Sequence, residues 1–260
     1  MEVIIKSTPD AASNEAARIF AAQLRRKPAS VLGLATGSTP LGLYRELAAR
    51  HERGEIDFSA VTTFNLDEYI GLPATHPRSY ANYMRELFFS KIKIPPGRTH
   101  IPDGMAPDIP AHCAEYEAAI KNAGGIDLQL LGLGTDAHIG FNEPGSSLTS
   151  RTRLKTLTEN TIRDNARFFA NSSEVPRHVI TMGIGTIMEA RHCVVLATGE
   201  KKARAVAAMA EGPVTADAPA SILQMHPHCT LIIDEAAAAE SKRRDYYRWV
   251  YDNKPEWQRV

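Results

Sequence analysis

Short apolar runs alternate along the chain with longer segments in which apolar residues recur every three or four positions. The runs predict buried strands at residues 3–5, 31–35, 61–66, 126–133, 178–182, 193–197 and 229–233. The periodic segments predict helices at residues 8–27, 41–50, 79–91, 111–122, 160–169, 183–190, 199–211 and 219–225. Strands that are apolar on both faces are typical of a parallel sheet covered by helices on both sides. The pattern therefore predicts an α/β fold with a mainly parallel sheet.

Nothing in the sequence divides this alternation into separate units. There is no internal repeat, no low-complexity tract and no change of composition that would indicate a linker. Residues 94–110 are rich in Pro and Gly and predict a loop, and the segment after residue 233 is expected to be helical. We therefore expect a single domain over residues 1–260.

Composition and charge exclude several classes of protein. The chain has 30 Lys and Arg residues and 30 Asp and Glu residues, so its formal net charge is zero. A neutral chain gives no support for non-specific binding to nucleic acid or to an anionic membrane. No apolar run approaches the roughly 18 residues that a membrane-spanning helix needs. The first apolar run is also too short for a signal peptide. We expect no nucleic-acid partner and no membrane partner.

The cysteines are few and scattered. Cys113, Cys193 and Cys229 lie far apart and form no CxxC pair. An odd, dispersed set argues against a disulfide framework and against a cysteine zinc site. Free thiols are typical of a reducing cytoplasm, which is the location we expect.

The segment Thr36-Gly37-Ser38-Thr39-Pro40 joins a predicted strand to a predicted helix. Gly37 lets a ligand approach the backbone closely, and the start of the helix adds free N–H groups. Ser38 and Thr39 offer hydroxyl groups beside them. This combination predicts a site for an anion, above all phosphate, although a plain helix cap would give the same pattern. The segment matches neither GxxxxGK[ST] nor GxGxxG, so we predict no nucleotide cofactor.

Two further segments offer cations for such an anion. Arg167 lies beside two phenylalanines near a predicted helix end, and Lys201 and Lys202 follow a strand in the first turn of a helix. Cations are unfavourable at a helix N-terminus, so lysines there indicate a bound anion that offsets them. A solvated lysine is the ordinary alternative. Arg167, Lys201 and Lys202 are the candidate partners of such a phosphate.

A pair of carboxylates follows the strand predicted at residues 61–66. Asp67 and Glu68 come directly after its last apolar residue. A carboxylate at the mouth of a buried strand loses part of its hydration, which raises its pKa toward that of a useful general base. An aspartate that caps the next turn is an equally good interpretation of this segment alone.

Residues 130–144 contain the densest set of reactive side chains. The segment ends a buried strand in glycines and then presents Asp136, His138 and Glu143. Ligands of open α/β sheets bind beyond the carboxyl ends of the strands, so these side chains are candidates for acid–base chemistry. A turn with solvated polar residues is one alternative. A divalent-metal site made of one histidine and two carboxylates is another, but we expect no metal.

Together these segments resemble the glucosamine-6-phosphate deaminase family. The resemblance rests on residues 36–40, 64–69 and 134–144, and it continues through residues 150–157, 167–169, 183–186 and 223–227. It covers nearly the whole chain and is weakest at the C-terminal end. It implies a modified Rossmann-like α/β fold. It also implies the conversion of glucosamine 6-phosphate and water to fructose 6-phosphate and ammonia in amino-sugar catabolism, without metal or organic cofactor.

The resemblance also implies roles for the candidate residues. Asp67 would be the base that moves a proton from C2 to C1 of the sugar, and His138 would assist opening of the ring. Asp136 and Glu143 would orient that histidine and tune its charge. The implied phosphate site consists of Gly37, Ser38, Thr39, Arg167 and Lys202. Ala137 departs from the family, which usually has glycine there, and its methyl group is expected to narrow the backbone or shift the histidine slightly.

A second set of residues resembles a regulatory site. Arg151, Arg153 and Lys155 alternate, so an extended segment would place them on one face, as a basic patch or as a charged strand edge. Hexameric members of the family bind the effector N-acetylglucosamine 6-phosphate in a regulatory pocket. The residues of this chain that resemble that pocket are Ser146, Arg153, Lys155 and Thr156. Monomeric, unregulated members also exist. We expect a homo-oligomer, with a hexamer and allosteric activation as hypotheses.

Two other functions compete with this interpretation. A 6-phosphogluconolactonase would also bind a sugar phosphate and use acid–base residues at strand ends, but residues 67–69 and 141–144 favour the deaminase. A sugar-phosphate sensor of a transcription regulator would need a helix-turn-helix, and we identify no segment for one.

Overall fold

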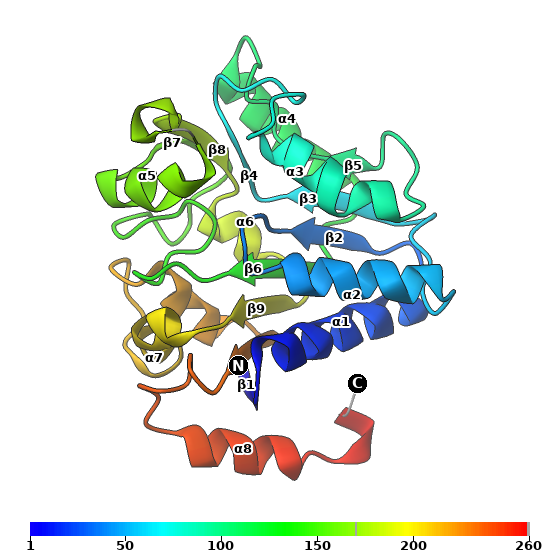
Figure 1. Ribbon diagram of the computed structural model, residues 1–260, viewed down its shortest axis with the longest axis vertical. Coiled ribbons are helices and arrows are strands. Elements are labelled where there is room, and N and C mark those ends of the chain that lie inside the picture. Colours follow the sequence, from blue (N-terminus) through cyan, green and yellow to red (C-terminus); the bar gives the residue numbers. More distant parts are fainter. Residues whose placement is uncertain (170, 259–260) are drawn as a thin grey trace.

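The computed structural model describes residues 1–169 and 171–258 (Figure 1). Its central element is a seven-stranded sheet in the order β1-β10-β9-β6-β2-β3-β5, in which every pairing is parallel. Its strands are β1 (Glu2–Lys6), β2 (Val31–Leu34), β3 (Thr62–Asn65), β5 (Thr99–His100), β6 (Leu128–Gly132), β9 (Cys193–Ala197) and β10 (Cys229–Asp234). The predicted parallel sheet is confirmed. The edge strand β5 was not predicted, because it lies in the segment rich in Pro and Gly.

A second, three-stranded antiparallel sheet has the order β4-β8-β7. Its strands are β4 (Asp67–Tyr69), β7 (Arg153–Thr156) and β8 (His178–Thr181). The sequence does not predict that the chain enters a new strand at Asp67. The reason is that β4 is short and polar, and its pairing with β8 is a tertiary contact that no local pattern contains. The register places Asp67, Thr181 and Arg153 in one row across this sheet.

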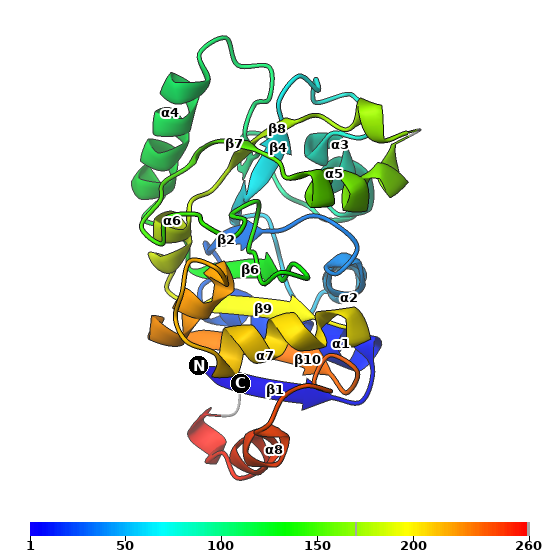
Figure 2. The same cartoon turned by 90° about the vertical axis from the view of Figure 1, so that its left-hand side faces the viewer.

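Helices cover both faces of the central sheet, with α1 and α2 on one side and α4 and α6 on the other (Figure 2). The α-helices are α1 (Pro9–Arg26), α2 (Leu41–Glu52), α3 (Tyr80–Leu87), α4 (Ile109–Asn122), α5 (Glu159–Asn165), α6 (Ile184–Met188), α7 (Ala203–Glu211) and α8 (Arg244–Asp252). The 3₁₀ helices are η1 (Phe89–Lys91), η2 (Ala166–Phe168), η3 (Ser172–Glu174), η4 (Glu200–Lys202), η5 (Pro219–Met225) and η6 (Glu256–Gln258). In the described ranges no helix combines the length and the apolar character needed to cross a bilayer.

Local chemistry explains where several helices begin. The N-cap residues of α1, α3 and α5 are Thr8, Ser79 and Thr158, and each side chain accepts a hydrogen bond from a backbone N–H in the first turn. The helices predicted at 79–91 and 160–169 are each divided into an α-helix and a 3₁₀ turn. The segment between β10 and α8 is a series of turns, so the helix predicted for the whole C-terminal segment is confirmed only in part.

The strand order fixes where a ligand can bind. β2 lies between β3 and β6, because the chain first builds β3 and β5 on one side of β2 and then crosses to the other side to build β6. Such a reversal leaves a crevice between the loops that follow the strands, at their carboxyl ends. Gly37, Asp67 and His138 follow β2, β3 and β6 at this edge of the sheet, whereas Arg167 and Lys202 lie on the 3₁₀ helices η2 and η4.

Candidate functional site

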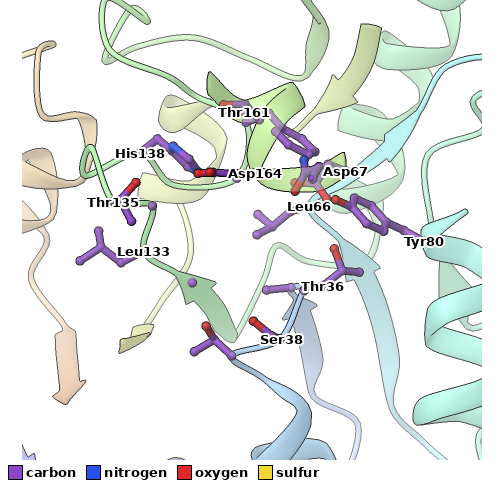
Figure 3. Close-up of a pocket in the computed structure, with 18 of the residues that line it drawn as sticks. Thr36, Ser38, Leu66, Asp67, Tyr80, Leu133, Thr135, His138, Thr161 and Asp164 are labelled. Atoms are coloured by element: carbon purple, nitrogen blue, oxygen red, sulfur yellow. The ribbon is translucent and has the colours of Figure 1, made fainter. Parts of the chain in front are cut away.

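A pocket lies at the carboxyl ends of β2, β3 and β6, where the strand order reverses (Figure 3). The residues predicted from the sequence that line it are Gly37, Ser38, Thr39, Asp67, His138, Arg167 and Lys202. Figure 3 shows Asp67 and Tyr80 on one wall, His138 on the opposite wall, and Ser38 at a third point of the rim. The fold therefore brings together residues from segments that are far apart in the sequence.

Asp67 presents a buried carboxylate to this pocket. The residue is 6% exposed, and among the described residues no group donates a hydrogen bond to its carboxylate. Burial, and next the charge of Glu68, raise the pKa of Asp67 to about 8. The ionised form of such a group is a stronger base than an ordinary carboxylate, which suits it to accept a weakly acidic C–H proton.

Glu68 shows what the Asp67 carboxylate lacks. Its carboxylate is also buried, but it accepts hydrogen bonds from the backbone N–H groups of Tyr69 at 2.8 Å and of Tyr80 and Ala81 at 2.9 Å. Two of these donors are the first residues of α3, so Glu68 caps that helix. Burial raises the pKa of Glu68, and the three hydrogen bonds oppose the rise. We therefore assign Glu68 a structural role.

His138 lies in the loop after β6, where Asp136 fixes its orientation. His138 Nδ1 lies 2.6 Å from Oδ1 of Asp136, which also accepts a hydrogen bond from the His138 backbone N–H at 3.2 Å. Burial acts to raise the pKa of Asp136, but the contacts with His138 outweigh it and leave the pKa below its ordinary value. The ring folds back over Gly134, where a Cβ would lie 2.3 Å from the imidazole. Only glycine fits at that position.

Ala137 has a left-handed backbone with φ of 63°, which no other non-glycine residue in the described part of the chain shares. A Cβ in this conformation costs roughly 1–2 kcal/mol, which explains why glycine suits the position. The methyl group is buried. Alanine in place of the expected glycine therefore strains the backbone directly before His138.

The contacts of Glu143 lie with α5, and its predicted influence on His138 stays a prediction. Its carboxylate accepts hydrogen bonds from the N–H and the hydroxyl of Thr158, both at 3.1 Å, and from the hydroxyl of Thr161. In residues 1–169 and 171–258 it forms no hydrogen bond with His138. Thr158 is the N-cap of α5, so Glu143 fastens the start of the helix whose side chains line the pocket. Closeness in sequence suggested a partner of His138, but the chain turns this side chain toward α5.

The loop after β2 forms the end of the pocket that suits an anion. Gly37 has φ of 96°, and its carbonyl accepts a hydrogen bond from the Tyr83 hydroxyl at 2.5 Å. The N-cap of α2 is Pro40, which provides no side-chain hydrogen bond, so the first N–H groups of that helix remain available to a ligand. Ser38 and Thr39 line the pocket between these two features. The arrangement suits a phosphate.

Two cations face the same end. Lys202 ends the 3₁₀ helix η4 and is half-buried, and it forms no ion pair with a residue that the structure describes. Burial lowers the pKa of Lys202, while the charges of Asp164 and Asp136 oppose this effect. Arg167 of η2 lines the pocket beside it. Lys201 does not line this pocket but an adjoining cavity, whose lining also includes Arg167 and Lys202.

Several lining residues were not singled out from the sequence. Tyr80 is partly buried, and the burial of its hydroxyl raises its pKa well above the ordinary value. Its hydroxyl lies 3.4 Å from that of Tyr69. Thr161, Asp164 and Asn165 of α5 also line the pocket. Their spacing of three and four residues places them on one face of a helix, a signal that could have identified them.

The residues predicted to bind an effector do not all share one surface. Arg153 and Lys155 lie on the half-buried face of the edge strand β7, whereas Thr156 is exposed and points to the other face. The Ser146 hydroxyl is buried and has no hydrogen-bond partner among the described residues. Arg151 forms ion pairs with Glu117 and Glu189, so it does not join a basic patch with Arg153 and Lys155.

In the described ranges no group of three or more His, Cys, Asp or Glu side chains could hold a metal ion. His226 is buried, its Nε2 lies 2.8 Å from the Ala190 carbonyl, and its Nδ1 accepts a hydrogen bond from the His228 backbone N–H. These contacts give His226 a structural role.

Comparisons with known proteins agree on one family. A family model described as glucosamine-6-phosphate isomerases/6-phosphogluconolactonase matches residues 6–232. A curated glucosamine-6-phosphate deaminase of Arthrobacter sp. (strain FB24) is 58% identical over 258 residues, which are 99% of each chain. A second, of Pseudarthrobacter chlorophenolicus, is 58% identical over 260 residues and the full length of both chains.

Solved structures give the same fold. A structure described as a monomeric glucosamine-6-phosphate deaminase superposes with a TM-score of 0.91 at 45% identity, covering 92% of this chain and all of that one. The 6-phosphogluconolactonase of Trypanosoma cruzi superposes with a TM-score of 0.73 at 21% identity, covering 93% of this chain and 97% of that one. The second likeness concerns the fold alone.

Proposed function

Because the chain belongs to the glucosamine-6-phosphate isomerase and 6-phosphogluconolactonase family, we propose that its pocket converts glucosamine 6-phosphate and water to fructose 6-phosphate and ammonia. One observation carries the proposal. The buried Asp67 carboxylate, which has no hydrogen-bond donor among the described residues, faces His138 in a pocket whose other end suits phosphate. The names of relatives at 58% identity support the same substrate. The reaction belongs to amino-sugar catabolism.

The phosphate fixes the substrate before chemistry begins. The backbone N–H groups of residues 37–39 and of the first turn of α2 donate hydrogen bonds to the phosphate oxygens, and Lys202 and Arg167 supply positive charge. His138 then takes the proton of the C1 hydroxyl and returns it to the ring oxygen as the C1–O5 bond breaks. Asp136 holds the imidazole in place for both transfers. The product of this step is the open-chain amino aldehyde.

Asp67 performs the isomerisation. Its carboxylate removes the proton from C2, and the electron pair forms a C1=C2 double bond while the C1 oxygen takes the proton that the substrate's ammonium group loses. The same group then delivers the proton to C1, and the C2=N double bond forms. Water adds to C2, and the nitrogen leaves as ammonia to give the C2 ketone of fructose 6-phosphate. A pKa of about 8 makes Asp67 basic enough to take the proton and acidic enough to return it.

The direct test is product formation from glucosamine 6-phosphate without added metal, with ammonia and fructose 6-phosphate measured separately. Equal amounts of both, unaffected by a chelator, are the expected result. Turnover of 6-phosphogluconolactone in place of glucosamine 6-phosphate would reject the deaminase in favour of the lactonase. Binding of a sugar phosphate with no turnover of either glucosamine 6-phosphate or 6-phosphogluconolactone would favour a sensor.

Regulation and assembly form a separate part of the proposal. We propose that the chain forms a homo-oligomer, up to a hexamer, and that N-acetylglucosamine 6-phosphate binds at Arg153 and Lys155 with Ser146 and Thr156 nearby. Burial lowers the pKa of the Arg153 guanidinium, which forms no ion pair with a carboxylate among the described residues, and this supports an anion there. The monomeric solved relative stands against assembly. A hyperbolic substrate curve that the effector leaves unchanged would reject regulation, and sedimentation measures the assembly.

We further propose that residues 1–260 act as one domain in the cytoplasm. The pocket draws its lining from loops between residues 35 and 202, which supports a single unit. Buried thiols that form no disulfide suit a reducing compartment, and such thiols are Cys113, Cys193 and Cys229. Limited proteolysis and a thiol count of the purified protein test these two points.

A further inference from the structure

Asn142 joins the two halves of the pocket. The residue is fully buried and follows the loop that carries His138. Its Nδ2 donates hydrogen bonds to the carbonyl of Ile139 at 2.9 Å and to the carbonyl of Met182 at 2.8 Å. Its Oδ1 accepts a hydrogen bond from Nη1 of Arg153 at 2.9 Å. Both amide protons and the amide oxygen are thus used.

The two carbonyl groups that Asn142 contacts lie on opposite sides of the pocket, one near His138 and one near Asp67. Ile139 is the neighbour of His138. Met182 follows β8, and its N–H donates a hydrogen bond to the carbonyl of Leu66 at 2.7 Å, directly before Asp67. The amide of Asn142 therefore connects the backbone beside His138 with the backbone beside Asp67.

Only asparagine can make this connection at this position. It requires two donors and one acceptor at the end of a short side chain, all in one plane. Aspartate has no donor, and the longer glutamine would place its amide beyond the three partners. A loss of any one partner leaves a buried polar atom without a hydrogen bond, which the surrounding loops must shift to repair.

Arg153, the third partner of Asn142, lies on the edge strand β7. It lies in the same row of the small sheet as Asp67, two strands away, with Thr181 between them. Its guanidinium is half-buried, and Nη1 also donates a hydrogen bond to the Arg151 carbonyl at 3.2 Å. Movement of this guanidinium would leave the Asn142 oxygen without its donor.

We propose that Asn142 is a positioning residue that sets the gap between Asp67 and His138, and that Arg153 holds it in place. The inference rests on the proposed function for the identity of the two reacting groups. It requires no effector, because the contact belongs to the protein alone. The phosphate end of the pocket lies on other loops, so the connection acts on the reacting groups and leaves phosphate binding unchanged.

The experiment starts from Arg153, because a change at the fully buried Asn142 could prevent folding. Arg153→Gln removes the guanidinium, and Arg153→Lys keeps a charged donor. Arg151→Gln is the matched control, because it removes the same group from the same segment but its partners are Glu117 and Glu189. For each variant, kcat and KM for glucosamine 6-phosphate are measured. The ring resonances of His138 are followed by NMR and assigned with His138→Gln.

We expect Arg153→Gln to lower kcat about 5–20-fold with KM within about twofold, and to shift the His138 resonances. Arg153→Lys should recover most of kcat, and Arg151→Gln should resemble the parent. Asn142→Ser combined with Arg153→Gln should cost no more kcat than Asn142→Ser alone, because both break one connection. A role confined to folding would lower stability without this division between kcat and KM.

Parent-like kcat and parent-like His138 resonances in Arg153→Gln would overturn the inference, and so would an equal effect of Arg151→Gln. A parent that does not deaminate glucosamine 6-phosphate would reject the proposed function instead. In that case the resonances still decide whether Arg153 acts on His138 through Asn142, since they need no turnover.

Discussion

The central sheet has titratable groups at both ends of its strands, and the two ends differ in how those groups are partnered. At the carboxyl end, Asp67 is buried without a hydrogen-bond donor in the described part of the chain, and burial raises its pKa to about 8. At the amino end, burial lowers the pKa of His192 to about 4. His192 Nε2, however, lies 2.9 Å from the hydroxyl of Thr230.

The thiols at the amino end of the sheet are also buried, and burial keeps them unreactive. Cys193 and Cys229 occupy matched positions on β9 and β10. Burial raises the pKa of Cys229 to about 12, so it stays protonated. Burial therefore perturbs pKa values equally well at both ends. The carboxyl end becomes a site because its polar atoms face a pocket and the reversal of strand order keeps that pocket open.

The largest expected difference in turnover between the two ends comes from changing Asp67. Asp67→Asn should lower kcat by roughly 10²–10⁴-fold with KM largely unchanged, because it removes the base and keeps the shape. His192→Gln at the amino end is the matched change and should leave kcat within about twofold. Steady-state assays of both variants give the result. Equal losses of turnover would mean that the two ends do not differ in function.

The phosphate end of the pocket supplies the next largest effect. Lys202→Gln should raise KM by roughly 10–100-fold, since a hydrogen bond to a charged group is lost, with a smaller change in kcat. Lys201→Gln is the control, because this neighbour lies outside the pocket. The measurement is KM for glucosamine 6-phosphate at fixed ionic strength. A similar KM for the two variants would remove Lys202 from the phosphate site.

The two ends should also give opposite slopes of stability against pH. The folded-state pKa of Asp67, about 8, lies above its unfolded value of about 3.9, so its contribution to stability falls as pH rises from about 4 to 8. The folded-state pKa of His192, about 4, lies below its unfolded value of about 6.5. Its contribution is therefore present above pH 6.5 and is lost as pH falls toward 4.

Urea denaturation of the parent, Asp67→Asn and His192→Gln between pH 4 and pH 9 measures these slopes. Asp67→Asn should remove a falling slope and His192→Gln a rising one. Slopes that stay parallel to the parent in both variants would show that neither pKa is shifted in the folded state.

The smallest expected effect concerns the strained residue before His138. Ala137→Gly relieves a left-handed Cβ, but it also gains freedom in the unfolded chain and loses a buried methyl group. These terms nearly cancel, so the free energy of unfolding should change by less than about 1 kcal/mol. We expect kcat within about twofold. A tenfold change in kcat would mean that the strain itself positions the histidine.

Local chemistry predicted much of this site, and tertiary contacts account for the rest. Gly37 and Asp67 could be placed together from the sequence because parallel strands carry their following loops to the same edge. The hydrogen bonds of Glu143 could not be predicted, because its partners belong to α5, fifteen or more residues further along the chain. Tyr80 was missed for a similar reason, since Glu68 recruits the start of α3 to the pocket wall. Such contacts have no local pattern.

The separation of the phosphate end from Asp67 lets the pocket select substrates by the length of their carbon chain. In the proposed reaction the substrate is held by its phosphate on C6 while Asp67 acts on C2, so the number of carbons between them has to match the distance across the pocket. A five-carbon amino sugar phosphate anchored in the same way would stop short of Asp67. The enzyme would then hold it as a dead-end ligand, and chain length would be selected at the proton transfer and not at capture.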